Sequence, residues 1–122
     1  MQKRRKIVAI VDDDPRMRRA TETLLDASGF ASELFASGED FLDSGPTTQA
    51  DCLLLDIDLG SMSGIELRRQ LAASGSTLPV IFVTALDDEA IHRRALMAGC
   101  VALLRKPFTA RQLIDAIEKA GC

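Results

Sequence analysis

The sequence predicts an α/β fold: a doubly wound (βα)5 domain whose five-stranded parallel sheet carries helices on both faces. Three observations predict it. Short apolar runs begin near residues 7, 31, 52, 80 and 100. Each gap between runs is long enough for a helix, and this alternation favours parallel strands joined by right-handed crossovers. Several runs are continuously apolar, as expected of strands that are covered on both faces.

Length and composition narrow the possibilities. The chain has 122 residues, so we expect residues 1–122 to form a single domain. A net charge of -3 weakly disfavours nucleic-acid binding by this domain. The basic cluster Lys3, Arg4, Arg5 and Lys6 is interpreted as a solvated approach to the first strand. Neither a signal peptide nor a membrane-spanning stretch is visible, which predicts a cytoplasmic protein without membrane contact.

Three cysteines, Cys52, Cys100 and Cys122, are odd in number and far apart in sequence. We therefore predict no disulfide, no zinc site and no redox motif.

The first half of the chain contains three predicted strands. Residues 7–11 form the first strand, and Asp14-Pro15 is a suitable N-cap and first position for a helix over 15–28, stopped by Gly29. Part of its expected inner face is formed by Ala20, Leu24 and Leu25. The strand over 31–35 is less apolar, which favours a place near the sheet edge. A short helix opens at residues 37–40, includes Phe41 and Leu42, and ends at Gly45-Pro46. The third strand covers 52–55.

The second half continues the alternation. A loop over 58–63 leads to a helix over 64–73, with Ile65 and Leu71 directed inward. Strand 80–83 ends at Thr84, and a helix over 88–97 stops at Gly99. The fifth strand covers 100–104. Residues 109–112 are a capping box that starts the last helix, whose apolar face holds Leu113, Ile114 and Ile117.

Polar side chains stand at the carboxyl ends of four predicted strands: Asp12 and Asp13, Asp56, Thr84, and Lys106. Carboxyl ends of parallel strands share one edge, so these residues should converge. Three crowded carboxylates need a cation, and all-oxygen ligands suit Mg²⁺. An ammonium and a hydroxyl can donate to phosphoryl oxygens.

Taken singly, these residues have ordinary interpretations: an N-cap aspartate, a buried threonine, a solvated lysine, an acid at a strand end. Their joint occurrence favours phosphoryl transfer to Asp56, a nucleophile that is already ionised at neutral pH. His92, the only histidine, is predicted to lie in a helix and is not available as a base.

Four segments resemble the receiver domain of two-component response regulators, over residues 7 to 120. They are Ile10 to Asp14, Leu55-Asp56 with Gly64 eight residues later, Val83-Thr84-Ala85, and Lys106-Pro107-Phe108. The resemblance implies the flavodoxin-like fold of chemotaxis receivers. It also implies a phosphorelay protein that is not an enzyme beyond Mg²⁺-dependent self-phosphorylation and autodephosphorylation.

The resemblance further implies individual roles. Asp56 would be the phosphoacceptor, and Mg²⁺ would be held by Asp12, Asp13, Asp56 and the backbone carbonyl of Asp58. Thr84 would turn toward the phosphoryl group and Lys106 would pair with it. The Lys106-Pro107 bond would be cis.

Three positions depart from the usual family pattern. Gly60 replaces a common proline, and Leu103 occupies a position that often holds an aromatic switch residue. Asp58 adds a carboxylate beside the site. We hypothesise that it strengthens the metal requirement and alters dephosphorylation, which Asp58→Asn would test.

The implied partners follow from the family. A sensor histidine kinase would donate the phosphoryl group. The surface of residues 88–119 would switch and form a possible homodimer or dock an output partner. DNA would be contacted only through an output domain that this chain does not contain.

Two alternatives remain open at this point. The segment Leu54 to Asp58 also resembles the first motif of haloacid-dehalogenase-type phosphatases, although their acidic pair comes late in the chain. A receiver that works through protein contacts without phosphorylation is the other, kept open by Gly60 and Leu103.

Overall fold

The structure is a computed structural model that describes residues 5–44, 49–60 and 62–121. Five parallel strands form one sheet in the order β2-β1-β3-β4-β5. They are β1 (Ile7–Val11), β2 (Ala31–Phe35), β3 (Cys52–Asp56), β4 (Val80–Thr84) and β5 (Ala102–Arg105). The predicted α/β fold class is confirmed, and β2 lies at a sheet edge as its weaker apolar character predicted.

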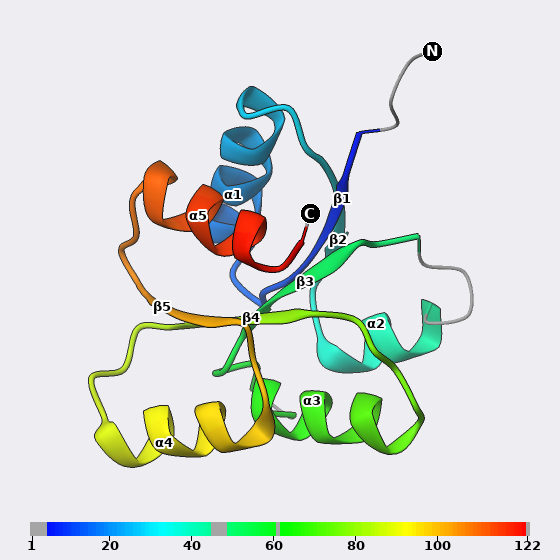
Figure 1. The fold of residues 1–122 in the computed structure, drawn as a ribbon, viewed down its shortest axis with the longest axis vertical. Helices are drawn as coiled ribbons and strands as arrows, with labels where there is room; N and C mark the ends of the chain where they lie inside the picture. The colour runs from blue at the N-terminus through cyan, green and yellow to red at the C-terminus, as the bar shows by residue number, and fades with distance from the viewer. Residues whose placement is uncertain (1–4, 45–48, 61, 122) are drawn as a thin grey trace.

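Five helices alternate with the strands and cover both faces of the sheet (Figure 1). They are α1 (Pro15–Ala27), α2 (Gly38–Ser44), α3 (Gly64–Ala73), α4 (Glu89–Ala98) and α5 (Ala110–Lys119). Helices α1 and α5 lie on one face, and α2, α3 and α4 lie on the other. None of the helices found in the described ranges is long and apolar enough to cross a membrane.

Each face of the sheet has its own hydrophobic core, because successive strand residues point to opposite sides. Val8 and Ile10 pack with Leu25 of α1 and Leu113 of α5. Ala9 and Val11, the alternate residues of the same strand, pack into the other core, which holds the buried side chains of α2, α3 and α4. The strands are therefore covered on both faces, which explains their continuous apolar runs.

Side-chain caps fix where the helices begin. Asp14 accepts from the backbone N–H groups of Arg16 and Met17, and Thr109 and Gln112 form the predicted capping box. Asp88 caps α4. These caps start helices within a few residues of the carboxyl ends of β1, β4 and β5, so the intervening loops are short.

Two details of the predicted fold are wrong. Ala20 is exposed, and its neighbour Thr21 is buried instead, together with the predicted Leu25. The Thr21 hydroxyl donates to the Met17 carbonyl 2.9 Å away, so this polar side chain is buried with its hydrogen bond satisfied. The fifth strand begins at Ala102 rather than at residue 100, because the chain turns at Gly99 with φ +91° and pairing with β4 starts later.

The described members of the N-terminal basic cluster, Arg5 and Lys6, are exposed, as predicted. Arg5 forms an ion pair with Asp26, 3.0 Å away, and donates to the carbonyl groups of Gly29 and Phe30. It thereby ties the approach to β1 to the end of α1. Lys3 and Arg4 lie outside the described residues, as do the Gly45-Pro46 helix stop and Cys122. Cys52 and Cys100 carry thiols, as expected.

Candidate functional site

Asp56 is the last residue of β3 and lies at the carboxyl edge of the sheet. It is almost fully buried. Its Oδ1 accepts a hydrogen bond from the Asp58 amide at 3.0 Å. The next residue, Ile57, still donates to the Val83 carbonyl 2.9 Å away. Sheet pairing therefore continues past Asp56 and fixes its backbone.

Gly64, the first residue of α3, packs directly on the end of β3. Its amide donates to the Ile57 carbonyl at 2.8 Å. A Cβ atom at this position would lie 2.3 Å from the Asp56 carbonyl oxygen, closer than real Cβ contacts allow. The close approach of α3 to the Asp56 backbone therefore requires glycine.

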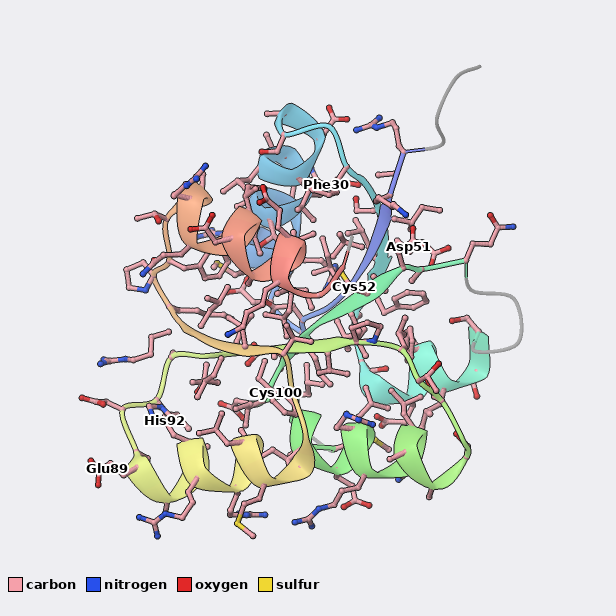
Figure 2. All side chains as sticks on the ribbon, viewed as in Figure 1. Phe30, Asp51, Cys52, Glu89, His92 and Cys100 are labelled. Carbon is pink, nitrogen blue, oxygen red and sulfur yellow. The ribbon has the colours of Figure 1, made fainter. Side chains whose placement is uncertain are left out.

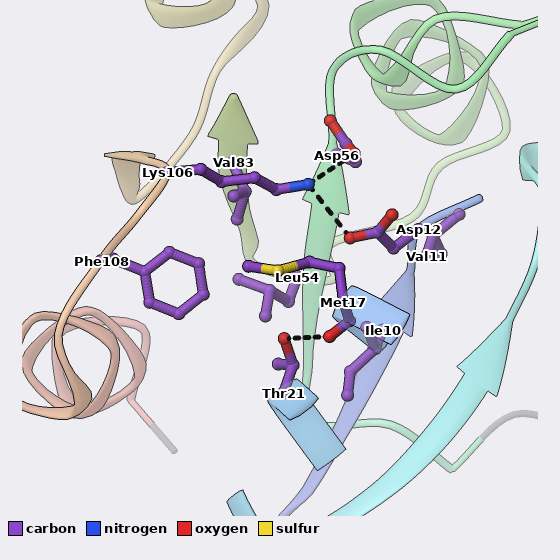
Figure 3. A pocket seen from close by; sticks show the side chains of 10 residues that line it. All are labelled: Ile10, Val11, Asp12, Met17, Thr21, Leu54, Asp56, Val83, Lys106 and Phe108. Carbon is purple, nitrogen blue, oxygen red and sulfur yellow. Dashed lines mark hydrogen bonds and ion pairs between the residues drawn. The ribbon is translucent and has the colours of Figure 1, made fainter. Parts of the chain in front are cut away.

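Lys106 links two carboxylates at the centre of the site (Figure 3). Its Nζ lies 2.9 Å from Oδ2 of Asp56 and 3.2 Å from Oδ2 of Asp12. The Lys106 amide donates to the Thr84 carbonyl at 2.8 Å, so the residue is placed by the pairing of β5 with β4. The Lys106-Pro107 peptide bond is cis, as predicted.

Asp12, Asp13 and Asp56 form an acidic cluster whose carboxylate ligand atoms lie within 4.8 Å of one another. Asp12 and Asp56 are buried, and Asp13 is exposed. The cluster contains only oxygen donors, one of them open to solvent. This donor set fits Mg²⁺, which prefers oxygen ligands and keeps several waters.

Burial and charge act in opposite directions on the central pair. Desolvation by burial raises the pKa of Asp56, although the hydrogen bond and charge of Lys106 lower it in part. Burial by itself would lower the pKa of Lys106, but Asp56 and Asp12 raise it overall. The ammonium is thus held in its charged form, while the carboxylate is less acidic than an exposed aspartate. A bound divalent cation would favour the ionised carboxylate.

Thr84 is fully buried at the end of β4. Its Oγ1 accepts a hydrogen bond from the Leu86 amide at 3.0 Å. Within the described ranges, no hydrogen bond joins this hydroxyl to Asp56 or Lys106. The structure therefore brings together Asp12, Asp13, Asp56 and Lys106, and places Thr84 at the same edge with its hydroxyl bonded to the following loop.

Asp58 lies in the loop after β3 and is exposed. Its amide contacts Asp56, as described above. Its predicted role as a carbonyl ligand stays a prediction.

A cavity of about 10 Å³ lies behind the ion pairs, lined in part by Met17, Thr21 and Phe108 (Figure 3). This volume is close to that of one water-sized probe. It cannot hold an organic substrate. A reacting phosphoryl group would therefore reach Asp56 from the open edge of the sheet.

Two side chains at the site escape prediction from sequence. Arg18 of α1 donates from Nη1 to the Asp12 carbonyl at 2.8 Å. His92 of α4 places Nε2 2.9 Å from the Leu86 carbonyl. Both contacts are to backbone carbonyl oxygens, which every residue has, so the amino-acid sequence does not indicate the acceptor. The only available signal for Arg18 was its position one turn after the Asp14 cap.

Comparisons with known proteins agree with this geometry. Residues 8–118 match the family model of the response regulator receiver domain. The chain belongs to the response regulator receiver family. The match decides against the phosphatase alternative.

The similar proteins are response regulators. The chain is 33% identical to the response regulator protein TodT of Pseudomonas putida over 120 residues, covering 98% of this chain and 53% of TodT. It is 34% identical over 113 residues to the transcriptional regulatory protein FixJ of Bradyrhizobium diazoefficiens, covering 93% of this chain and 55% of FixJ. The crystal structure of FixJ-N superposes with a TM-score of 0.89 at 35% identity, covering 98% of this chain and 94% of FixJ-N.

The chain thus spans about half the length of the curated relatives it matches. A receiver domain of the two-component type corresponds to that half.

Proposed function

We propose that this receiver accepts a phosphoryl group on Asp56 from a sensor histidine kinase and passes the signal through the surface of residues 88–119. One observation supports it most: a buried carboxylate at the end of β3 is paired with Lys106 at 2.9 Å and clustered with Asp12 and Asp13. These are the groups that an in-line transfer needs around its nucleophile.

The transfer itself balances simply. A carboxylate oxygen of Asp56 attacks phosphorus, the phosphorus–nitrogen bond to the kinase histidine breaks, and its electron pair returns to the imidazole. The product is an acyl phosphate on Asp56. Because the nucleophile is already an anion, this step needs no general base.

The residues around Asp56 have separate tasks in the proposal. Lys106 is held charged and would donate to a phosphoryl oxygen. The Thr84 hydroxyl would turn from the Leu86 amide toward another. Asp12, Asp13, Asp56 and the Asp58 carbonyl would hold Mg²⁺, which would neutralise the crowded negative charge.

The proposed output is a population shift. A phosphoryl group that binds Thr84 favours a different arrangement of the loop after β4, and so of the helix that follows. The exposed face of residues 88–119 would then form a homodimer or dock a partner. We further propose that the chain acts with an output domain, as expected from relatives twice its length, and that any DNA contact is made there.

Intact mass spectrometry tests the proposal. The protein is incubated with a small-molecule phosphodonor, with and without Mg²⁺. The expected result is a Mg²⁺-dependent gain of one phosphoryl group in the wild type and none in Asp56→Asn.

A beryllofluoride mimic completes the test, because it does not hydrolyse like an acyl phosphate. Binding of the mimic without a mass gain would indicate a phosphoryl group that is lost quickly. Neither a mass gain nor binding would reject the proposal in favour of a receiver that works without phosphorylation.

A further inference from the structure

His92 lies on α4, beside the loop that joins β4 to α4 (Figure 2). Its Nε2 is 2.9 Å from the Leu86 carbonyl oxygen. A carbonyl oxygen can only accept, so Nε2 carries the proton in this contact. The side chain thereby joins the loop to the helix that follows it.

The same residue, Leu86, is held at its other backbone group by Thr84. Its amide donates to Thr84 Oγ1 at 3.0 Å. Leu86 is thus fixed through its N–H by the threonine and through its C=O by the histidine. Both bonds hold backbone groups on either side of the Leu86 Cα, so a displacement of that Cα affects both.

The loop is also held at its far end, where Asp88 caps α4. Residues 85–88 are all exposed, and Leu86 is 41% exposed beside a depression of about 250 Å³. The ion pair between Asp87 and Arg105, at 3.4 Å, is exposed and contributes little. Packing leaves the centre of the loop room to shift, and the two hydrogen bonds of Leu86 hold that centre.

We propose that His92 is a positioning residue for Thr84. By holding the Leu86 carbonyl, it keeps the Leu86 amide on the Thr84 hydroxyl. It therefore favours the arrangement in which that hydroxyl is turned away from Asp56. This inference rests on the proposed function, in which Thr84 turns toward a phosphoryl group on Asp56.

In this proposal, His92 disfavours the arrangement that binds a phosphoryl group on Asp56. In this proposal the Leu86 carbonyl contact belongs to the present arrangement, so releasing it shifts the population toward the alternative. His92→Leu should bind beryllofluoride, in the presence of Mg²⁺, about two- to tenfold more tightly than the wild type, the range of one hydrogen bond. His92→Gln retains a side-chain N–H of similar reach and should restore the wild-type affinity.

Two controls separate positioning from a general change in α4. Ala90→Leu places leucine on an exposed position of the same helix and keeps His92, so its affinity should equal the wild type. In a Thr84→Ala background the Leu86 amide has lost its acceptor. There His92→Leu should no longer change the affinity, which a merely structural role of His92 would not predict.

Isothermal titration of the six proteins with the mimic decides the matter. Equal affinity of wild type and His92→Leu, with the wild type binding normally, would overturn the inference and leave the proposed function intact. An equal gain in both the Thr84 and Thr84→Ala backgrounds would overturn the link to Thr84. A wild type that does not bind the mimic would reject the proposed function and the inference together.

Discussion

Two halves of the site are held in different ways. Asp12 and Asp56, which are buried, and Lys106, which is partly buried, form a fixed half joined by ion pairs of 2.9 and 3.2 Å. Residues 84–88 form a movable half, in which Thr84 is buried but the loop is exposed and held by hydrogen bonds. In the proposed function, the fixed half would bind the phosphoryl group, and the movable half would change its arrangement in response.

The difference has a physical origin. A buried charged group must keep its partner, because an uncompensated charge in the interior costs several kcal/mol. An exposed loop can exchange its hydrogen bonds for water at a cost of about 1 kcal/mol each. In the proposed function, a phosphoryl group would therefore rearrange the loop without disturbing the charges that bind it.

Breaking the backbone of the fixed half should have the largest effect. In Gly64→Ala the new methyl group would overlap the Asp56 carbonyl oxygen, and neither backbone can move freely. We expect a loss of about 3 kcal/mol or more in the free energy of unfolding, measured by urea denaturation.

Gly75→Ala is the matched control for that substitution. Gly75 lies just after the C-cap of the same helix, α3. Its φ is +86°, and no heavy atom lies within 4 Å of an added Cβ. Its cost should be limited to the backbone conformation, about 1 kcal/mol. Similar losses in the two variants would show that the α3 contact with β3 is not tight.

Removing the ammonium should come next. In Lys106→Met the fixed half loses its cation and its donor to phosphoryl oxygens, so phosphorylation by a small donor should slow about ten- to one hundredfold. Initial rates from intact mass measure this. A rate equal to the wild type would contradict the role of Lys106.

The same variant predicts a pH effect with a definite sign. Burial raises the pKa of Asp56, and Lys106 counteracts the increase. Without Lys106 the pKa rises further, so more of the carboxyl is protonated at a given acidic pH. As pH falls, Lys106→Met should therefore lose reactivity at a higher pH than the wild type. The ratio of the wild-type rate to the variant rate should grow as pH falls.

The fixed half is also the more predictable half from sequence. Each of its residues follows a short apolar run, and the parallel topology alone brings the strand ends together. The strand assignments depend on those runs, and β1, β2 and the centre of β3 are correctly placed by them. Asp12, Asp13, Asp56 and Lys106 can be grouped from the amino-acid sequence alone, because each lies at or just after the carboxyl end of a strand and these ends share one edge of a parallel sheet.

The movable half cannot be predicted to the same degree. The contacts of Leu86 are made by its amide and carbonyl, which every non-proline residue has, so its identity carries no signal. The helical position of His92 is predictable from sequence. Its contact with Leu86 is not, because that contact depends on the path of the loop. Burial of Thr21 in place of Ala20 is a related case, since a hydroxyl satisfied within its own helix resembles an apolar group in the core.

Mg²⁺ binding tests the acidic cluster of Asp12, Asp13 and Asp56. Mg²⁺ at ten times its dissociation constant should stabilise the wild type by about 1.4 kcal/mol, because it binds only the folded cluster. Asp13→Asn removes one exposed carboxylate of the cluster and should weaken Mg²⁺ binding about tenfold. Melting temperature as a function of Mg²⁺ concentration measures both.

Asp14→Asn is the control for the metal experiment. Asp14 neighbours the cluster in sequence but caps α1, and asparagine caps a helix equally well. Its Mg²⁺ dependence should match the wild type. Equal weakening in both variants would mean that net charge, rather than the cluster, governs the metal effect.

The smallest expected effect concerns the end of the movable half. Asp88 accepts from the amides of Ala90 and Ile91 at 2.9 and 3.3 Å and so starts α4. Asp88→Ala should lower the free energy of unfolding by about 1 kcal/mol, whereas Asp88→Asn, which keeps an acceptor, should not. If the two halves are held independently, Asp88→Ala should leave the Mg²⁺ dissociation constant unchanged. A weakening as large as that of Asp13→Asn would show instead that the loop and the acidic cluster form one unit.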